Sequence, residues 1–93
     1  MRFAFLIWGD FSSQRDRVSF PDGQTEMIGV SSLEEACTVA RSLQEQGVDC
    51  IELCGAFEEA GARQVIQATG GKLPVGFVTH LAEQDGLFTA LFG

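Results

Sequence analysis

The sequence lacks the features that mark membrane and secreted proteins. No apolar run approaches the roughly 20 residues that a helix needs to cross a bilayer. The apolar segment Met1–Trp8 is shorter than a secretion signal, and no small-residue cleavage site follows it. There is no internal repeat, low-complexity segment or linker. We therefore expect a cytoplasmic protein without a membrane partner, folded as a single domain over residues 1–93, near the small end of chains that fold alone.

Basic residues are scarce. Six lysines and arginines stand against 13 acidic residues, and the net charge is −7. A field of that sign repels nucleic acid, and no cluster of basic residues reverses it locally. We therefore expect no nucleic-acid partner.

The usual cofactor and metal motifs are also missing. There is no dinucleotide-binding glycine pattern, and Gly71-Lys72 lacks the glycine spacing and the following Ser or Thr of a phosphate-binding loop. Cys54 and His80, with Asp10 or Glu52, could together supply three metal ligands. No paired Cys-x-x-Cys spacing supports such a site, so we predict neither a metal nor a cofactor.

The three cysteines predict reduced thiols, because their number is odd and the chain has no secretion signal. Cys50 and Cys54 lie four residues apart on one predicted strand, roughly 13 Å along an extended chain. A disulfide needs alpha carbons within about 7 Å, so these two cannot bridge each other. Cys37 falls in the apolar stripe of a predicted helix, which indicates a packed and inert thiol.

Four segments predict strands of a largely parallel sheet. The first, Phe3–Trp8, is continuously apolar, which is typical of a central strand covered on both faces. The other three predicted strands are Thr25–Val30, Val48–Leu53 and Leu73–His80. Arg17–Phe20 precedes the turn signal Pro21-Asp22-Gly23 and could form a hairpin with the second strand.

Helices are predicted between these strands. Ser32 and Glu35 form a capping box, and Gly47 ends the helix that they start. A second helix is predicted over about 56–68, and a short third over 83–92. The alternation of strands and helices predicts an α/β fold, with a small, mostly parallel four-stranded sheet and a further hairpin strand, flanked by two or three helices.

Polar and reactive residues collect where the predicted strands end. In open parallel sheets, ligands bind at the carboxyl ends of the strands. The residues at these ends are Trp8, Gly9, Asp10, Ser31, Ser32, Cys54, Gly55, Thr79 and His80. The leading hypothesis is therefore a small-molecule or anion site at this edge, with Trp8, Asp10, Gly55 and Thr79 as binding residues.

Two other classes of function stay open. Cys54 and His80 end neighbouring predicted strands and could act as nucleophile and base of a thiol-dependent enzyme, or form only a buried thiol beside a structural histidine. Glu52 shares the strand face of Cys54, which we expect a helix to cover, so it needs a partner such as His80, Arg63 or a backbone donor. It could serve the catalytic site or tie down a loop. The third class is a structural or interaction module without a pocket.

Phenylalanines near both ends of the chain suggest a homodimer. A chain of 93 residues has little area in which to bury Phe11, Phe20, Phe88 and Phe92. A partner copy would supply that area.

Two segments also resemble a known family. They are Gly47–Phe57, with its Glu-Leu-Cys-Gly-Ala-Phe run, and Ala68–Gly76, which leads into a strand ending in histidine. Together they resemble a family of short bacterial proteins that is catalogued only as a domain of unknown function. The resemblance covers nearly the whole chain and implies a compact α/β fold, but no established activity.

Overall fold

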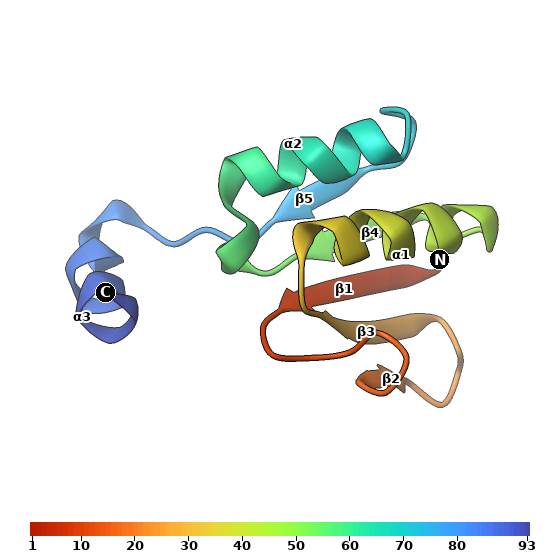
Figure 1. Cartoon of the computed structure of the whole chain (residues 1–93), viewed down its shortest axis with the longest axis horizontal. Coiled ribbons are helices and arrows are strands. Elements are labelled where there is room, and N and C mark those ends of the chain that lie inside the picture. The colour runs from red at the N-terminus through yellow and green to blue at the C-terminus, as the bar shows by residue number, and fades with distance from the viewer.

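The chain folds around a five-stranded sheet in the order β2-β3-β1-β4-β5, with β1 at its centre (Figure 1). The computed structural model describes residues 1–93. The strands are β1 (Phe3–Trp8), β2 (Arg17–Ser19), β3 (Thr25–Val30), β4 (Cys50–Leu53) and β5 (Val75–Phe77). The helices are α1 (Leu33–Glu45), α2 (Glu58–Ala68) and α3 (Asp85–Phe92), with 3-10 turns η1 (Gly55–Phe57) and η2 (Ala82–Gln84). All pairings are parallel except that of β2 with β3, so the predicted α/β class and the hairpin strand are confirmed.

The start of α1 follows the predicted capping box. The Ser32 hydroxyl oxygen accepts a hydrogen bond from the Glu35 backbone N–H at 3.0 Å. The reciprocal bond of a capping box, from the Ser32 N–H, is absent, and the Glu35 carboxylate instead accepts hydrogen bonds from the backbone N–H groups of Ser31, at 2.6 Å, and of Ser13, at 3.0 Å. It thereby ties the helix start to the loop between β1 and β2. At the other end, Gly47 takes the predicted left-handed conformation, with φ +89°.

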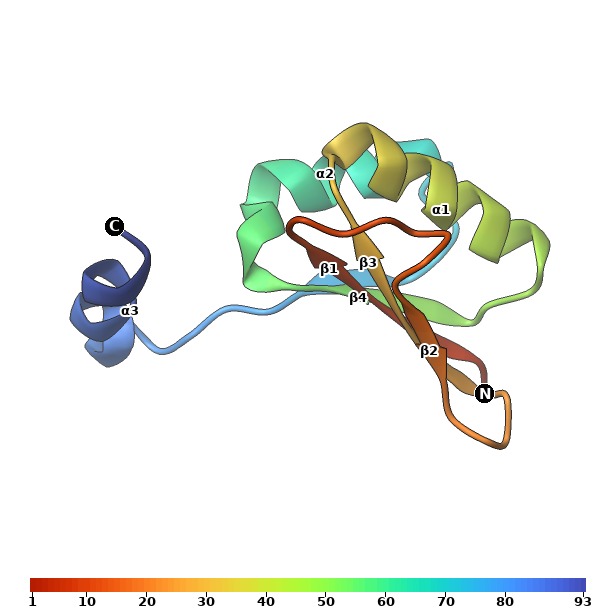
Figure 2. The same cartoon turned by 60° about the horizontal axis from the view of Figure 1, so that its bottom comes forward.

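Helices α1 and α2 cover the same face of the sheet (Figure 2). The connection through α1 runs from β3 past β1 to β4, and the connection through α2 continues in the same direction to β5. Because such connections are right-handed, two that advance in one direction place both helices on one side. The fully buried side chains of the core include Leu6, Ile28, Leu43, Ile51, Leu53, Val30 and Val65.

The opposite face of the sheet has no helix over it, and the expectation that β1 and Glu52 are covered on both sides was wrong. Along β1 the side chains of Ala4 and Leu6 are buried beneath the helices, while the alternating residues are only half-buried. We call this second surface the uncovered face; its residues are Phe3, Phe5, Ile7, Val18, Thr25, Met27, Gly29, Cys50, Glu52 and Gly76. An ideal Cβ on Gly29 would stand 2.6 Å from the Phe11 Cβ, so Phe11 folds over one corner of this face.

The last strand is shorter than the predicted segment Leu73–His80. Strand β4 ends at Leu53, which pairs with Phe77, so β5 has no further strand residue to pair with. One more backbone bond follows, from Val78 N–H to the Leu53 carbonyl oxygen at 2.9 Å. Thr79 and His80 therefore lie beyond the sheet.

The chain after β5 carries the predicted tail helix away from the sheet. Residues 78–93, which we call the C-terminal arm, comprise a connector, η2 and α3. Figures 1 and 2 both show α3 apart from the sheet and from the other two helices. No residue of α3 is buried. The radius of gyration is 13.5 Å, compared with about 12.3 Å for a globular domain of this length.

Candidate functional site

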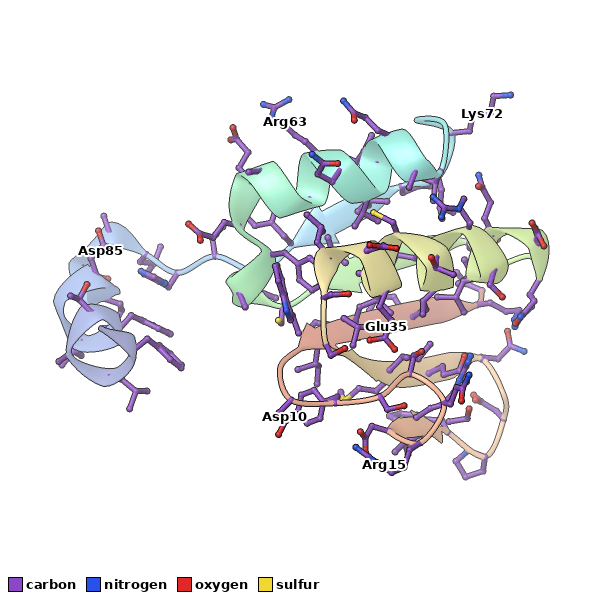
Figure 3. All side chains as sticks on the ribbon, in the orientation of Figure 1. Asp10, Arg15, Glu35, Arg63, Lys72 and Asp85 are labelled. Atoms are coloured by element: carbon purple, nitrogen blue, oxygen red, sulfur yellow. The ribbon has the colours of Figure 1, made fainter.

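Parallel strands bring Trp8 and Cys54 together at the carboxyl edge of the sheet. The Trp8 backbone N–H donates a hydrogen bond to the Cys54 sulfur at 3.3 Å. The Cys54 N–H donates to the Leu6 carbonyl oxygen at 3.0 Å. The Trp8 ring packs against the buried Phe57, with ring centroids 5.2 Å apart. An aromatic ring and a half-buried thiol thus share one corner, while the exposed Asp10 lies in the adjoining loop (Figure 3).

Cys54 and His80 share no hydrogen bond. The His80 Nε2 lies 2.6 Å from the Asp85 Oδ1, and its ring stacks on Phe88 with centroids 4.1 Å apart and an interplanar angle of 4°. Both partners belong to α3, so His80 is part of the C-terminal arm. The predicted nucleophile and base stand in separate environments in this structure.

Glu52 lies on the uncovered face, where no helix removes it from water. Its carboxylate sits above Gly76 of the neighbouring strand, since an ideal Cβ there would come within 2.7 Å of the Glu52 Oε2. It makes neither a hydrogen bond nor an ion pair. Of the expected partners, Arg63 pairs with Glu59 at 3.2 Å, and His80 pairs with Asp85. Solvation of the half-exposed carboxylate removes the need for a buried partner.

The two other cysteines have weakly acidic thiols. Burial raises the pKa of Cys37, and burial together with the neighbouring Glu52 and Asp49 raises the pKa of Cys50. All three cysteines are free. Thiolate chemistry is therefore disfavoured at Cys37 and Cys50.

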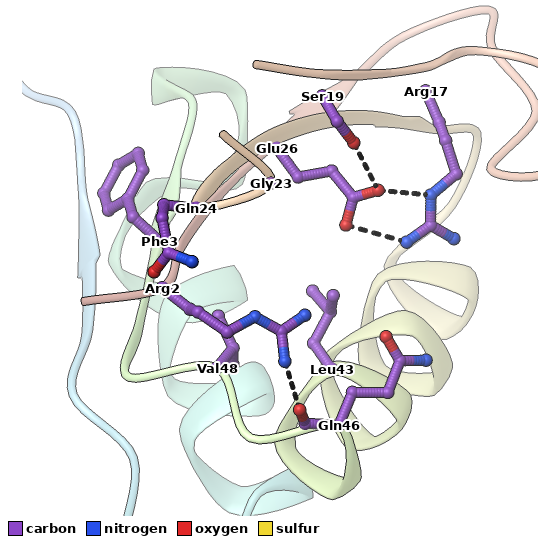
Figure 4. Close-up of a pocket in the computed structure, with 10 residues that line it drawn as sticks. All are labelled: Arg2, Phe3, Arg17, Ser19, Gly23, Gln24, Glu26, Leu43, Gln46 and Val48. Carbon is purple, nitrogen blue, oxygen red and sulfur yellow. Dashed lines mark hydrogen bonds and ion pairs between the residues drawn. The ribbon is translucent and has the colours of Figure 1, made fainter. Parts of the chain in front are cut away.

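Two hollows lie away from the carboxyl edge. One, of about 140 Å³, opens at the amino ends of β1 and β3 (Figure 4). Its charged lining is already paired: Arg17 binds Glu26 through two hydrogen bonds of 2.9 and 3.0 Å, and Arg2 donates to the Gln46 carbonyl oxygen. This pairing lowers the pKa of Glu26 and raises the pKa of Arg17. No basic group in it is left free to attract an anion.

A second hollow, of about 380 Å³, runs along α1. Its lining residues are Ser13, Gln14, Arg17, Thr38, Val39, Ser42 and Leu43. Arg17 and Leu43 border both hollows. Sequence reasoning missed these hollows because their walls come from a loop, a hairpin strand and a helix that carry no shared motif. The one sequence feature that could have indicated the first hollow is the opposite charge of Arg17 and Glu26, which lie on the two strands of the predicted hairpin.

No group of three or more His, Cys, Asp or Glu side chains is placed to hold a metal ion. No helix has the length and apolar character needed to cross a membrane.

Comparison with protein families assigns the chain to one family. Residues 1–93 match the family described as "Family of unknown function (DUF6506)", and the chain belongs to that family. The comparison with curated proteins and the comparison with solved structures each return no match. The resemblance to a family of short proteins of unknown function, inferred from the sequence, is therefore confirmed.

Proposed function

We propose that this member of the DUF6506 family is a self-associating module, and that its working form is a homodimer built on the uncovered face of the sheet. The observation that carries the proposal is the apolar character of that face. Phe3, Phe5 and Ile7 of the central strand are only half-buried, and Met27 beside them is 47% exposed. Contiguous exposed apolar surface on a small protein marks an interaction site.

The charge distribution of the sheet favours the same face. The strands contain three charged residues, Arg17, Glu26 and Glu52. Arg17 and Glu26 pair with one another on the side of the helices. Glu52 is therefore the one charged strand residue on the uncovered face. Two copies of a chain with net charge −7 repel one another, and a face nearly free of carboxylates is where they approach at least cost.

Sedimentation velocity over a wide concentration range tests the proposal. We expect a reversible dimer, and we expect Met27→Lys to weaken it at least tenfold, because a lysine would have to lose water in an apolar interface. The matched control is Ile66→Lys, which places the same residue on α2, where Ile66 is 36% exposed. Circular dichroism checks that both variants fold. A wild-type chain that stays monomeric at all concentrations contradicts the proposal.

A second candidate is the binding of a small molecule or anion at the carboxyl edge, through Trp8, Asp10, Gly55 and Thr79. It is supported by the contact of the Trp8 N–H with the Cys54 sulfur, which gives that corner an aromatic ring, a thiol and loop backbone together. A thiol-dependent reaction at Cys54 with His80 as base and Glu52 nearby is the enzymatic form of this candidate. It requires His80 to leave Asp85 and Phe88.

The pH dependence of Cys54 alkylation tests this second candidate. The free thiols suit a reducing compartment, and we expect the protein to work in the cytoplasm. An activated Cys54 would be alkylated with an apparent pKa well below the ~8.5 of an ordinary thiol, and His80→Ala would restore the ordinary value. Peptide mass spectrometry separates its rate from those of Cys37 and Cys50. An ordinary pH profile at Cys54 rules out the enzymatic form.

A further inference from the structure

The C-terminal helix α3 exposes its apolar side. Leu87, Leu91 and Phe92 are 67%, 74% and 77% exposed. The helix has eight residues, and isolated helices shorter than about 12–15 residues are marginal in water. Its apolar side chains therefore need a surface on which to pack, and the other elements of its own chain do not provide one in this structure.

The arm is built to hold α3 away from its own sheet. The connector Val78–Leu81 follows β5 out past the carboxyl edge (Figure 1). Between Phe77 and Asp85 there is neither glycine nor proline, and the β-branched Val78 and Thr79 favour extended backbone. His80 stacks on Phe88 and pairs with Asp85, so the connector is attached to the helix. The connector itself has no glycine or proline with which to turn back towards β1, and the turn that the chain makes comes after the connector, at η2.

The protein also exposes more surface than a monomer of its size. Its accessible surface is 6032 Å², and a folded monomer of 10.0 kDa exposes about 5,200 Å². The excess of roughly 800 Å² equals the area that one partner contributes to a stable interface of standard size. Two apolar surfaces of the chain lack a partner, namely the uncovered face and the apolar side of α3.

We infer that these two surfaces bind one another across two copies of the chain. The arm of each copy reaches over its partner and packs Leu87, Leu91 and Phe92 onto the partner's uncovered face. A twofold axis makes the exchange reciprocal, so each copy gives one helix and receives one. Asp85 is the one charged residue of α3 and is already paired with His80, so docking need not bury an unpaired charge.

This inference rests on the proposed homodimer and adds the element that forms it. Leu91→Asp in the full chain tests it, because it places a carboxylate on the docking side of α3. The matched control is Thr89→Asp in the same helix, because Thr89 lies about 160° around the helix axis from both Leu87 and Leu91. By sedimentation equilibrium we expect the first variant to raise the dimer dissociation constant at least tenfold and the second to leave it within about twofold.

Nuclear Overhauser contacts in an equal mixture of ¹³C-labelled and unlabelled chains identify which copy supplies the helix. We expect contacts from Leu91 and Phe92 of one copy to Phe5 and Met27 of the other. A dimer in which these contacts occur only within one chain, or in which Leu91→Asp changes nothing, overturns the arm exchange and leaves the proposed homodimer standing. A wild-type monomer overturns both.

Discussion

Replacing Glu35 with glutamine would remove the charge that ties α1 to the loop before β2. The Glu35 carboxylate accepts hydrogen bonds from the Ser31 backbone N–H at 2.6 Å, from the Ser31 hydroxyl at 2.9 Å and from the Ser13 N–H at 3.0 Å. These donors, led by the Ser31 backbone, lower the pKa of Glu35 to about 2. Hydrogen bonds to the charged form favour that form.

The sign of the effect on stability follows from the direction of this shift. The pKa of Glu35 is lower in the folded chain than the roughly 4.3 of an unfolded glutamate. Its contribution is therefore fully present above about pH 4.3 and is lost as the pH falls towards 2. Because Glu35 lies close to solvent, screening reduces the benefit, and we expect Glu35→Gln to lower the free energy of unfolding by about 1–2 kcal/mol at pH 7.

Urea unfolding at pH 7 and pH 2.5, at one fixed protein concentration, measures this contribution. We expect the difference between wild type and Glu35→Gln to be fully present at pH 7 and to fall to about a quarter of that value at pH 2.5, because the folded-state carboxylate is protonated only near pH 2. The control is Glu34→Gln in the same helix turn, since the exposed Glu34 side chain makes no hydrogen bond. Equal losses at both pH values, or an equal loss in the control, would refute the reasoning.

Three further substitutions test the packing on the two faces of the sheet by thermal or urea unfolding. We expect Gly29→Ala to cost about 1–3 kcal/mol, because its methyl group would stand 2.6 Å from the Phe11 Cβ. We expect Gly76→Ala to cost less than about 1 kcal/mol, because the added methyl group meets only the flexible end of the Glu52 side chain, at 2.7 Å. A larger loss of stability for Gly76→Ala than for Gly29→Ala contradicts both expectations. We expect Leu6→Ala, in the covered core, to cost about 2–5 kcal/mol, and a smaller loss than for Gly29→Ala contradicts the assignment of the core.

The local elements could be predicted from the sequence because their signals are local. Ser32 and Glu35 indicated the start of α1, and Gly47 its end, through backbone rules that need no knowledge of the rest of the chain. The central position of β1 followed from its apolar run. These features were confirmed.

The uncovered face could not be predicted, for a physical reason. A strand face can be apolar because a helix covers it or because a second copy of the chain binds it. Phe3, Phe5 and Ile7 give the same apolar pattern in either case. The strand order distinguishes them: both connections advance from β3 towards β5, and this places α1 and α2 on one side. The order is a tertiary property that one sequence does not display.

The position of His80 could not be predicted from the sequence either. The apolar run from Val75 to Val78 does not indicate where strand pairing ends, because that depends on the length of β4. Pairing stops opposite Leu53, and the chain that follows is free to leave the sheet. His80 consequently pairs with Asp85 on the arm and not with Cys54.

The position of Glu52 is compatible with burial of the uncovered face in the proposed dimer. An unpaired carboxylate at the centre of an interface would oppose association, and stable interfaces keep their charged groups at a polar rim. Glu52 lies towards the β5 edge, above Gly76, while the aromatic side chains Phe3 and Phe5 belong to the central strand. A helix docked over β1 and β3 can therefore cover the aromatic centre and leave the Glu52 carboxylate in water. The absence of a side chain at Gly76 gives that carboxylate the room to stay there.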